Sequence, residues 1–464
     1  MARKLPSEIE VEISQLGSDG FGKAVYRTVD QGAVAARGTT NPRTQDSVER
    51  ELRVKNALPG ERVAAKVLKH RRGQWLAEAR KVTANRSAIR IAASCAYFPR
   101  CGGCAMQHLR YDQQLLLKQH KLERALSDSG VTPMSWQPPA HGPRFHYRTK
   151  ARLGVKVVAD QLLVGFRESF SSRVGRMDDC QTLIPAFSSL LPDLKRMLSM
   201  LSIPRLIPQI EVAAGDSDRA LIVRHLADLS DADKSILVEF AHRHDVLLFS
   251  QGAGYDTIVP LNLNTSRTTN SSYLGYANPD FGLYFQFLPW EFTQVNLPMN
   301  RQLVRAALLA LAVVPGASVV DLFCGIGNFS LALAAAGAQV RGLEMSRSAI
   351  ERASMNAELN GLSERCEFLE ADLYDPACSP LEDARYLLLD PPRSGAGVNL
   401  GRWLDQNRPE RVVYVSCEPS SFAADAARCQ THGYALQQVG IYDMFPHTTH
   451  IETLGLFVRL EPQS

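Results

Sequence analysis

Residues 411–419 read R-V-V-Y-V-S-C-E-P, and the C-terminal half of the chain is organised around them. The apolar, β-branched run predicts a buried strand. Pro419 suits the first turn of a helix, because its missing N–H would have no hydrogen-bond partner there. Cys417 is therefore expected between a strand's carboxyl end and a helix start, where α/β sheets bind ligands and the helix favours a thiolate. Considered alone, this cysteine fits a buried structural role as well as a chemical one.

A second strand–turn–helix pattern predicts a cofactor loop. Residues 319–330 read V-V-D-L-F-C-G-I-G-N-F-S, and the two glycines let a ligand approach the backbone. Glu344 ends the next predicted strand, with a carboxylate able to accept hydrogen bonds from ribose hydroxyls. A dinucleotide site would need G-x-G-x-x-G, whereas this loop has only G-x-G, so the pattern favours S-adenosylmethionine. Cys324, inside the loop, is expected to pack rather than react.

Two further acidic residues are predicted at strand ends. Residues 386–393, Y-L-L-L-D-P-P-R, bring Asp390 to the end of a strand, and residues 443–452, D-M-F-P-H-T-T-H-I-E, place Glu452 before the last strand. Either acid alone is more often a helix cap or a surface charge. Together with Cys417, at the ends of strands of one sheet, they predict a catalytic site.

Three cysteines lie within ten residues, in the pattern C-x5-C-G-G-C formed by Cys95, Cys101 and Cys104, and Cys180 follows at a distance. Four thiolates suit tetrahedral zinc or an iron–sulfur cluster. Zinc sites usually carry two C-x2-C pairs and this chain has one, so the spacing favours [4Fe–4S], with zinc as the alternative. Isolated structural thiols are the third interpretation.

The N-terminal segment predicts a small β-barrel. Apolar and polar residues alternate over residues 7–28, a polar loop follows over 29–52, and the strand pattern resumes over 61–82. Such barrels often bind RNA with a basic face. Residues 61–176 carry 22 lysines and arginines against 7 acidic residues, a net +15 that leaves −11 for the rest of a chain whose total is +4. This asymmetry favours nucleic acid as the partner.

Length and pattern predict three domains, because 464 residues are too many for one hydrophobic core. We expect the β-barrel over residues 1–82, a central α+β domain with the cysteine cluster over 83–270, and a doubly wound α/β domain over 271–464. Helices are predicted over residues 112–126, 187–201, 231–244 and 301–313.

No feature of the sequence indicates export or a membrane. The first residues, M-A-R-K-L-P, lead into three glutamates rather than an apolar signal core. No apolar stretch approaches the ~20 residues that a membrane helix needs. We therefore expect a cytoplasmic protein without a membrane partner, whose nine cysteines are reduced or bind a metal rather than form disulfides.

Taken together, these motifs resemble the RNA 5-methyluridine methyltransferases, and most closely the RlmD (RumA) type that acts on large-subunit ribosomal RNA. The resemblance covers nearly the whole chain and rests on C-x5-C-G-G-C, D-L-F-C-G-I-G-N-F, L-D-P-P-R, V-S-C-x-P and D-M-F-P-H-T-x-H-I-E. Relatives acting on transfer RNA lack both barrel and cysteine cluster, and another ribosomal branch has the cluster without the barrel. The resemblance implies an OB-like TRAM barrel, an iron–sulfur central domain and a Rossmann-like methyltransferase domain.

The resemblance also implies residue roles and a reaction. That reaction is S-adenosylmethionine-dependent methylation of C5 of a specific uridine in 23S rRNA, with Cys417 as the nucleophile and Glu452 as the base. A monomer is the default expectation for the chain. A [4Fe–4S] cluster is implied on Cys95, Cys101, Cys104 and Cys180. Contacts with S-adenosylmethionine are implied for Gln294, Phe323, Asn328, Glu344, Asp372 and Asp390.

The chemistry of uracil explains why such residues are needed. C5 is a poor nucleophile until a thiolate adds to C6, and the C5 proton must leave after methyl transfer so that the thiolate is expelled. We expect Cys417 to attack, Glu452 to remove the proton and Asp390 to hydrogen-bond the uracil edge. The helix beginning at Pro419 is expected to lower the pKa of the Cys417 thiol.

This chain departs from the family at one position beside the nucleophile. The family commonly has Asn there, whereas this chain has Glu418, whose charge would raise the pKa of the neighbouring thiol. We therefore expect Glu418 to point away from the site, or to pair with Arg393 or Arg428.

Three alternative functions fit parts of the sequence. An amino-group methyltransferase would use the Asp390-Pro391-Pro392 loop to hold an exocyclic amine and would need no nucleophilic cysteine. A related uridine-5-methyltransferase could act on a different RNA, and a non-catalytic iron–sulfur RNA-binding factor would need no methyl donor. The first and last of these leave the combination of Cys417 with Glu452 unexplained.

Overall fold

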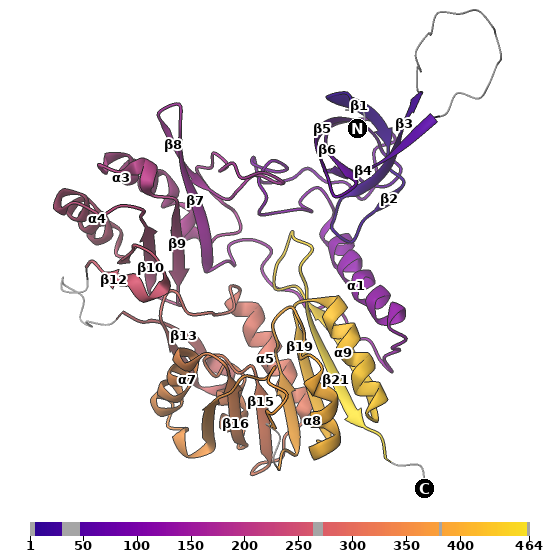
Figure 1. The fold of residues 1–464 in the computed structure, drawn as a ribbon, viewed down its shortest axis with the longest axis vertical. Helices are drawn as coiled ribbons and strands as arrows, with labels where there is room; N and C mark the ends of the chain where they lie inside the picture. The colour runs from indigo at the N-terminus through magenta and orange to yellow at the C-terminus, as the bar shows by residue number, and fades with distance from the viewer. Residues whose placement is uncertain (1–4, 30–46, 263–271, 380–382, 462–464) are drawn as a thin grey trace, which may run out of the picture. The chain divides into compact units, whose positions relative to one another are not determined.

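The computed structural model describes residues 5–29, 47–262, 272–379 and 383–461 (Figure 1). The chain divides into two compact units: Met1–Leu117 with His447–Thr449, and Lys118–Pro446 with His450–Ser464. The predicted domain boundaries near residues 82 and 270 stay predictions. None of the helices formed by the described residues combines the length and apolar character needed to span a bilayer.

A six-stranded sheet forms the core of the first unit, in the order β1-β5-β6-β4-β3-β2. The parallel pair is β4 with β6, and the other neighbouring strands run antiparallel. Buried Val54, Val63 and Trp75 belong to its apolar core. The strands are β1 (Glu8–Glu12), β2 (Gln15–Leu16), β3 (Gly22–Val29), β4 (Ser47–Lys55), β5 (Arg62–Arg71) and β6 (Gln74–Ala84).

The predicted polar loop over residues 29–52 is wrong at its C-terminal end. Residues 47–52 belong to β4, where Leu52 and Val54 point into the core while Arg53 between them is more exposed. The charged residues of this stretch occupy the outer face of a strand, which local polarity alone does not distinguish from a loop. Residues 30–46 of the predicted loop lie outside the described residues, and the closed TRAM-type barrel stays a prediction.

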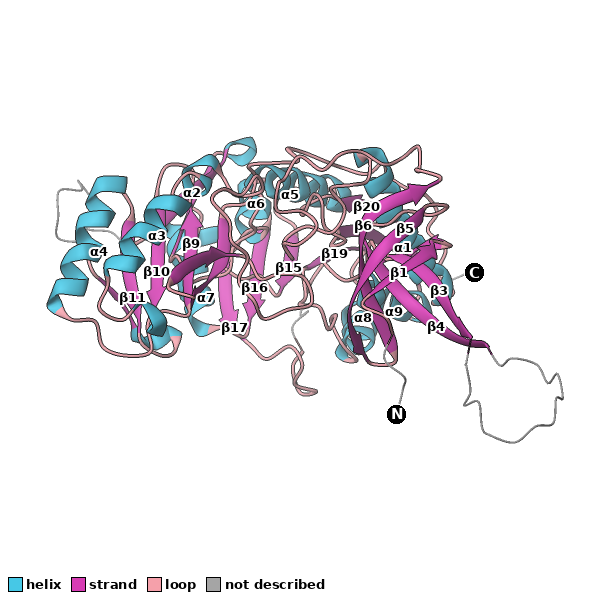
Figure 2. Ribbon diagram, turned by 90° about the horizontal axis from the view of Figure 1, so that it is seen from above, coloured by secondary structure: helices cyan, strands magenta, loops and turns pink. Residues whose placement is uncertain are grey.

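The second unit contains a mixed sheet of order β12-β11-β10-β9-β7-β8. In Figure 2 the helices α3 and α4 lie together beside β9, β10 and β11. The elements of this region are β7 (Lys150–Val158), β8 (Gln161–Gly165), α2 (Pro185–Ser188), α3 (Leu191–Met200), η1 (Pro204–Leu206), β9 (Gln209–Ala214), β10 (Arg219–Arg224), α4 (Asp231–His244), β11 (Leu247–Gln251), η2 (Tyr255–Thr257) and β12 (Ile258–Pro260).

The predicted helices are confirmed, with two differences in their limits. Residues 187–201 form two helices rather than one, because Pro192 lies in the first turn of α3, the place in a helix that tolerates proline. The helix predicted over 301–313 is α5 (Leu297–Leu311), which begins one turn earlier because Asn296 caps it. Helix α1 (Tyr111–Asp128) and helix α4 occupy the predicted places.

The methyltransferase-type sheet is the second sheet of this unit, with seven strands in the order β17-β16-β15-β18-β19-β21-β20. All neighbouring strands are parallel except β21, which runs antiparallel to both β19 and β20. Its elements are β15 (Ser318–Leu322), α6 (Ser330–Ala335), β16 (Gln339–Glu344), α7 (Arg347–Leu359), η4 (Ser363–Arg365), β17 (Cys366–Glu370), β18 (Tyr386–Leu389), α8 (Asn399–Asn407), β19 (Arg411–Ser416), α9 (Pro419–Thr431), β20 (Tyr434–Tyr442) and β21 (Glu452–Arg459).

Helices cover both faces of this sheet, which confirms the predicted doubly wound arrangement. Alternate strand residues face opposite ways, so Val319 and Val413 pack with α5 and α6, whereas Val320 and Val412 pack with α8 and α9. Figure 1 shows α8 and α9 together beside the strands. A hairpin of β13 (Leu274–Asn278) and β14 (Leu283–Phe287), joined by η3 (Pro279–Phe281), adds its aromatic residues to the α5 side.

Candidate active site

Three predicted catalytic residues lie at one edge of the sheet: two follow the carboxyl ends of parallel strands, and the third begins the antiparallel strand β21. Leu389 at the end of β18 pairs with Tyr414 of β19, so Asp390 and Cys417 leave the sheet on the same side. Ser416 pairs with Thr453 in the antiparallel β21, so Cys417 and Glu452 lie immediately beyond this pair on adjacent strands. The strand register therefore gathers Asp390, Cys417 and Glu452, as the sequence predicts.

Burial, together with the charges of Glu452 and Asp390, raises the pKa of the half-buried Cys417 thiol to about 11. The Arg393 guanidinium lowers the same pKa through its charge and through a hydrogen bond to the thiol. The predicted contribution of the helix N-terminus stays a prediction, and the net pKa is raised by burial and two neighbouring carboxyl groups. The unliganded site therefore holds Cys417 mainly as a thiol.

Glu452 is 3% exposed, and its Oε2 has no hydrogen-bond partner among the described residues. Burial raises the pKa of Glu452 well above its usual range, with a further rise from Asp390 and an opposing effect from Arg393. Burial also raises the pKa of Asp390 to about 7. Two adjacent carboxyl groups with raised pKa values are a common arrangement in general acid–base chemistry.

Arg393 is the site residue that sequence reasoning considered only as a partner for Glu418. Its Nη2 lies 3.4 Å from His450 Nδ1, and its guanidinium hydrogen-bonds the Cys417 thiol. The L-D-P-P-R motif held the signal, because an arginine three residues after Asp390 reaches the same sheet edge.

Glu418 pairs with neither predicted arginine. Its Oε1 accepts a hydrogen bond from the Ser420 hydroxyl at 3.1 Å, and among the described residues it forms no ion pair. Arg428 instead pairs with Asp425 and donates to the Gly397 carbonyl. The first of the two expectations, that Glu418 points away from the site, stays a prediction.

The residues that are expected to contact the methyl donor lie at the carboxyl ends of neighbouring strands. Phe323 comes directly after β15, Glu344 ends β16, and Asp372 lies two residues beyond β17. Phe323 and Gly327 have φ angles of 63° and 88°, and a Cβ on Gly327 would lie 2.4 Å from Leu331 Cδ1. This loop therefore has a strained backbone and needs glycine at position 327.

The side-chain amide of Asn328 forms hydrogen bonds with other side chains of the protein. Its Oδ1 accepts from Asn300 Nδ2 at 2.8 Å, its Nδ2 donates to Asn300 Oδ1 at 3.0 Å, and the Tyr276 hydroxyl lies 3.4 Å from Oδ1. Asn300 is a residue that sequence reasoning missed, since its position in the first turn of α5 gives no sign of its partner. The pair orients the loop that is expected to hold the methyl donor.

The other residues that are expected to contact the methyl donor differ in their burial and hydrogen-bond partners. The Glu344 carboxylate accepts from the Ser346 backbone N–H at 3.0 Å. Exposed Asp372 accepts from the Tyr374 N–H at 2.9 Å, as an acid that stabilises a turn does. Gln294 is half-buried in the segment that precedes α5.

The four predicted cluster cysteines fall in different units of the chain. Cys95, Cys101 and Cys104 are half-buried in the first unit, and Cys180 is buried in the second. Within the described ranges, no group of three or more His, Cys, Asp or Glu side chains is close enough to hold a metal ion. The metal site therefore stays a prediction.

The surroundings of these cysteines fit a thiolate-bound cluster. The Gly103 N–H lies 3.3 Å from Cys101 Sγ, and Gln107 Nε2 lies 3.3 Å from Cys104 Sγ. Buried Lys55 Nζ donates to the carbonyls of Pro99 and Cys101. N–H donors directed at sulfur and a buried cation nearby both favour negatively charged ligands.

Two protein-family models match the C-terminal part of the chain. The methyltransferase domain family matches residues 314–388, and the tRNA (uracil-5-)-methyltransferase family matches residues 381–460.

Curated proteins match over most of the chain. The 23S rRNA (uracil(1939)-C(5))-methyltransferase RlmD of Alkalilimnicola ehrlichii is 43% identical, covering 98% of each chain. The protein of the same name from Bordetella pertussis is 41% identical over 88% of this chain and 89% of its own.

A solved structure shares the fold. The Pyrococcus abyssi tRNA (uracil-54, C5)-methyltransferase, in complex with S-adenosyl-L-homocysteine, has a TM-score of 0.69 at 22% identity, covering 97% of this chain and 100% of its own.

Proposed function

Because the chain belongs to the family of RlmD-type 23S rRNA (uracil-C5)-methyltransferases, we propose that it methylates C5 of the uridine corresponding to position 1939. The methyl donor is S-adenosylmethionine, in line with the two methyltransferase family models that match the C-terminal domain. The observation that carries the proposal is the meeting of a thiol, two carboxyl groups and an arginine at one sheet edge.

The reaction begins with addition of the Cys417 sulfur to C6 of uracil, which makes C5 nucleophilic. C5 then takes the methyl group from the sulfonium, and S-adenosylhomocysteine is released. Glu452 removes the C5 proton, the C6–sulfur bond breaks and the ring recovers its conjugation. The sum is uridine and S-adenosylmethionine giving 5-methyluridine, S-adenosylhomocysteine and one proton.

The surroundings of each group suit these roles. The Arg393 guanidinium favours the thiolate of Cys417 over the thiol. The unpartnered Oε2 of buried Glu452 is available to accept a proton, and its raised pKa makes it a strong enough base. Asp390, whose pKa is about 7, can both donate to and accept from the uracil edge near neutrality.

The test of this function uses RNA with 5-fluorouridine at the target position. Fluorine at C5 blocks the elimination, so wild-type protein and S-adenosylmethionine should give a stable protein–RNA adduct. The Cys417→Ala variant should give none and should methylate no natural RNA. A Cys417→Ala protein that still methylates RNA would remove the nucleophile from the proposal and favour an amino-group methyltransferase.

We also propose that Cys95, Cys101, Cys104 and Cys180 hold a [4Fe–4S] cluster. The support is the donor set of four thiols and the N–H groups directed at two of them. When bound, the cluster cross-links the segments that carry these cysteines. Protein prepared without oxygen should contain about four iron atoms per chain and absorb visible light. A colourless protein with one zinc would contradict the cluster.

The N-terminal sheet and the basic residues between positions 61 and 176 are proposed to bind the RNA backbone. The net charge of +15 in this range supports the proposal. RNA affinity should therefore fall steeply as salt rises, because each phosphate contact releases counterions. A salt-independent affinity would contradict it.

A further inference from the structure

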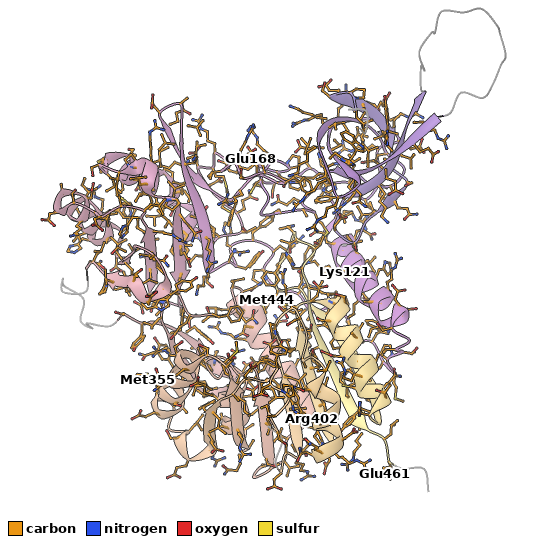
Figure 3. All side chains as sticks on the ribbon, viewed as in Figure 1. Lys121, Glu168, Met355, Arg402, Met444 and Glu461 are labelled. Carbon is orange, nitrogen blue, oxygen red and sulfur yellow. The ribbon has the colours of Figure 1, made fainter. Side chains whose placement is uncertain are left out.

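Three consecutive carbonyl groups in the segment leading to Glu452 accept hydrogen bonds from three buried side chains. The Met444 carbonyl accepts from Asn296 Nδ2 at 3.1 Å and the Phe445 carbonyl from Lys118 Nζ at 3.0 Å. The Pro446 carbonyl accepts from the Tyr147 hydroxyl at 3.2 Å. Figure 3 labels Met444, which follows the end of β20.

The three donors come from separate parts of the second unit. Lys118 lies on α1, Tyr147 lies before β7, and Asn296 lies directly before α5. All three are buried, and Lys118 is 1% exposed. Such convergence is more than a connecting loop needs, because loops usually satisfy their carbonyls with water.

Lys118 carries its positive charge into this segment. Its Nζ also lies 2.5 Å from Oδ1 of Asp443, which is fully buried. A buried ion pair is tolerated only with good geometry and further hydrogen bonds, and the Phe445 carbonyl supplies one of them. The pair therefore holds the start of the segment in one place.

Asn296 connects this segment to the expected binding site of the methyl donor. Its Oδ1 accepts from the Met299 N–H at 3.4 Å and caps α5, while its Nδ2 donates to Met444. The neighbouring Val295 carbonyl accepts from both the N–H and the hydroxyl of Thr149. Gln294, an expected methyl-donor contact, is the next residue along this held segment.

The held segment is connected directly to Glu452. Tyr442, the last residue of β20, pairs with Glu452 in the register of β20 and β21, so residues 443–451 form the connection between them. The ring of Phe445 lies 5.9 Å from the ring of His450, two residues before Glu452. A shift of residues 444–446 would therefore reach Glu452 in two ways. One is the strand pairing of Tyr442 with Glu452, and the other is the contact between the rings of Phe445 and His450.

We propose that Tyr147, Lys118 and Asn296 are positioning residues for the general base, holding the 443–451 connection so that Glu452 Oε2 faces C5 of the target uracil. This inference rests on the proposed function. The three residues contact residues 444–446 and act on Glu452 through the connection.

The test compares removal of the C5 proton, which needs the base, with the earlier addition and methyl transfer, which do not. Adduct formation with 5-fluorouridine RNA needs Cys417 and the methyl donor, whereas turnover of natural RNA also needs Glu452. Tyr147→Phe removes only the hydroxyl, and it should lower turnover about threefold to tenfold while adduct formation keeps its wild-type rate.

Tyr434→Phe is the matched control. The Tyr434 hydroxyl also donates to a proline carbonyl, that of Pro409 at 2.8 Å, and its side chain is equally buried, but it lies away from the connection. Both variants should lose similar thermal stability, and Tyr434→Phe should leave both rates unchanged.

Asn296→Asp supplies a second variant, because it keeps the acceptor that caps α5 and removes the donor to Met444. Turnover should fall about tenfold to a hundredfold, and a covalent complex with natural RNA should accumulate. Equal losses of turnover in Tyr147→Phe and Tyr434→Phe, or a fall in adduct formation that matches the fall in turnover, would overturn the positioning role. Full turnover by Glu452→Gln would instead remove the base itself, and the positioning proposal would fall with it.

Discussion

The catalytic edge of the seven-stranded sheet and the cysteine segment of the first unit organise their reactive groups differently. At the sheet edge, Asp390, Cys417 and Glu452 are brought together by strand register alone. Cys95, Cys101 and Cys104 instead lie on a segment between β6 and α1, and within the described ranges they form no group close enough to hold a metal. Backbone pairing pre-organises the first site, whereas a thiolate site takes its final geometry together with its metal.

The largest expected effect separates the two regions. Cys104→Ser should remove nearly all bound iron while S-adenosylmethionine affinity stays within about twofold of the wild type, because Cys104 belongs to a different unit from the expected methyl-donor contacts. The measurements are iron per chain and calorimetric titration of the methyl donor. Cys378→Ser, a half-buried thiol outside the predicted set, should retain its iron. A tenfold loss of donor affinity in Cys104→Ser would show that the sheet edge depends on the cysteine segment.

At the sheet edge itself, Glu452→Gln should lower turnover by about 10²-fold to 10⁴-fold, the usual contribution of a general base. The 5-fluorouridine adduct should still form, since that reaction stops before proton removal. The exposed Glu410→Gln, which loses a surface ion pair with Arg385, serves as the control. Unchanged turnover in Glu452→Gln would leave the C5 proton without an acceptor at this site.

The pH dependence of adduct formation should report the ionisation of Cys417. The pKa of this thiol is about 11 and the thiolate is the reactive form, so the rate should rise about tenfold per pH unit below that value. Arg393→Met should lower the rate at every pH, because the cation that favours the thiolate is gone. A flat profile between about pH 7 and 9 would mean that bound RNA already ionises the thiol.

A smaller effect is expected at the loop after β15 that contains Asn328 and is expected to hold the methyl donor. Asn300→Leu removes the partner of Asn328 and should weaken S-adenosylmethionine binding roughly tenfold, because a polar group is left without its hydrogen bonds. Asn360→Leu loses two hydrogen bonds with Tyr284 on a hairpin strand and one to the Asn356 carbonyl; it is the control and should bind the methyl donor normally. Equal affinities in the two variants would show that the amide pair does not orient the loop.

The smallest effect concerns stability. Burial raises the pKa of Asp321 to about 7, and its Oδ1 has no partner in the part of the chain that the structure describes. An acid whose pKa is raised on folding stabilises the protein at low pH, and this contribution is lost as pH rises through about 7. Relative to wild type, Asp321→Asn should therefore gain a few degrees in Tm between about pH 5 and 8. A difference in Tm that does not change with pH would contradict this.

Local pattern predicts the sheet edge well because each reactive residue follows or precedes a strand with a strong periodic signal. Asp390 and Cys417 follow parallel strands, and Glu452 begins the antiparallel β21, so the strand ends meet at one edge of the sheet. The position of Pro192 likewise explains in retrospect the break between α2 and α3.

Local sequence patterns do not predict hydrogen bonds between side chains that are far apart in the sequence. Asn300 and Tyr147 lie in an ordinary helix and an ordinary linker, and their roles depend on what the fold brings against them. The raised pKa of Cys417 likewise depends on the assembled fold. A helix end is visible in the sequence, whereas burial beside Glu452 is a property of the assembled sheet.

The place of β21 has a consequence for biosynthesis. This strand lies between β19 and β20 in the sheet, yet of the described strands it is the last to leave the ribosome. Until it inserts, β19 and β20 have no common neighbour, and Glu452, the proposed base, is missing beside Cys417, the proposed nucleophile. A nascent chain that bonded RNA at that stage could not release it. We expect that late insertion of the strand carrying Glu452 keeps the thiol from meeting RNA before release is possible.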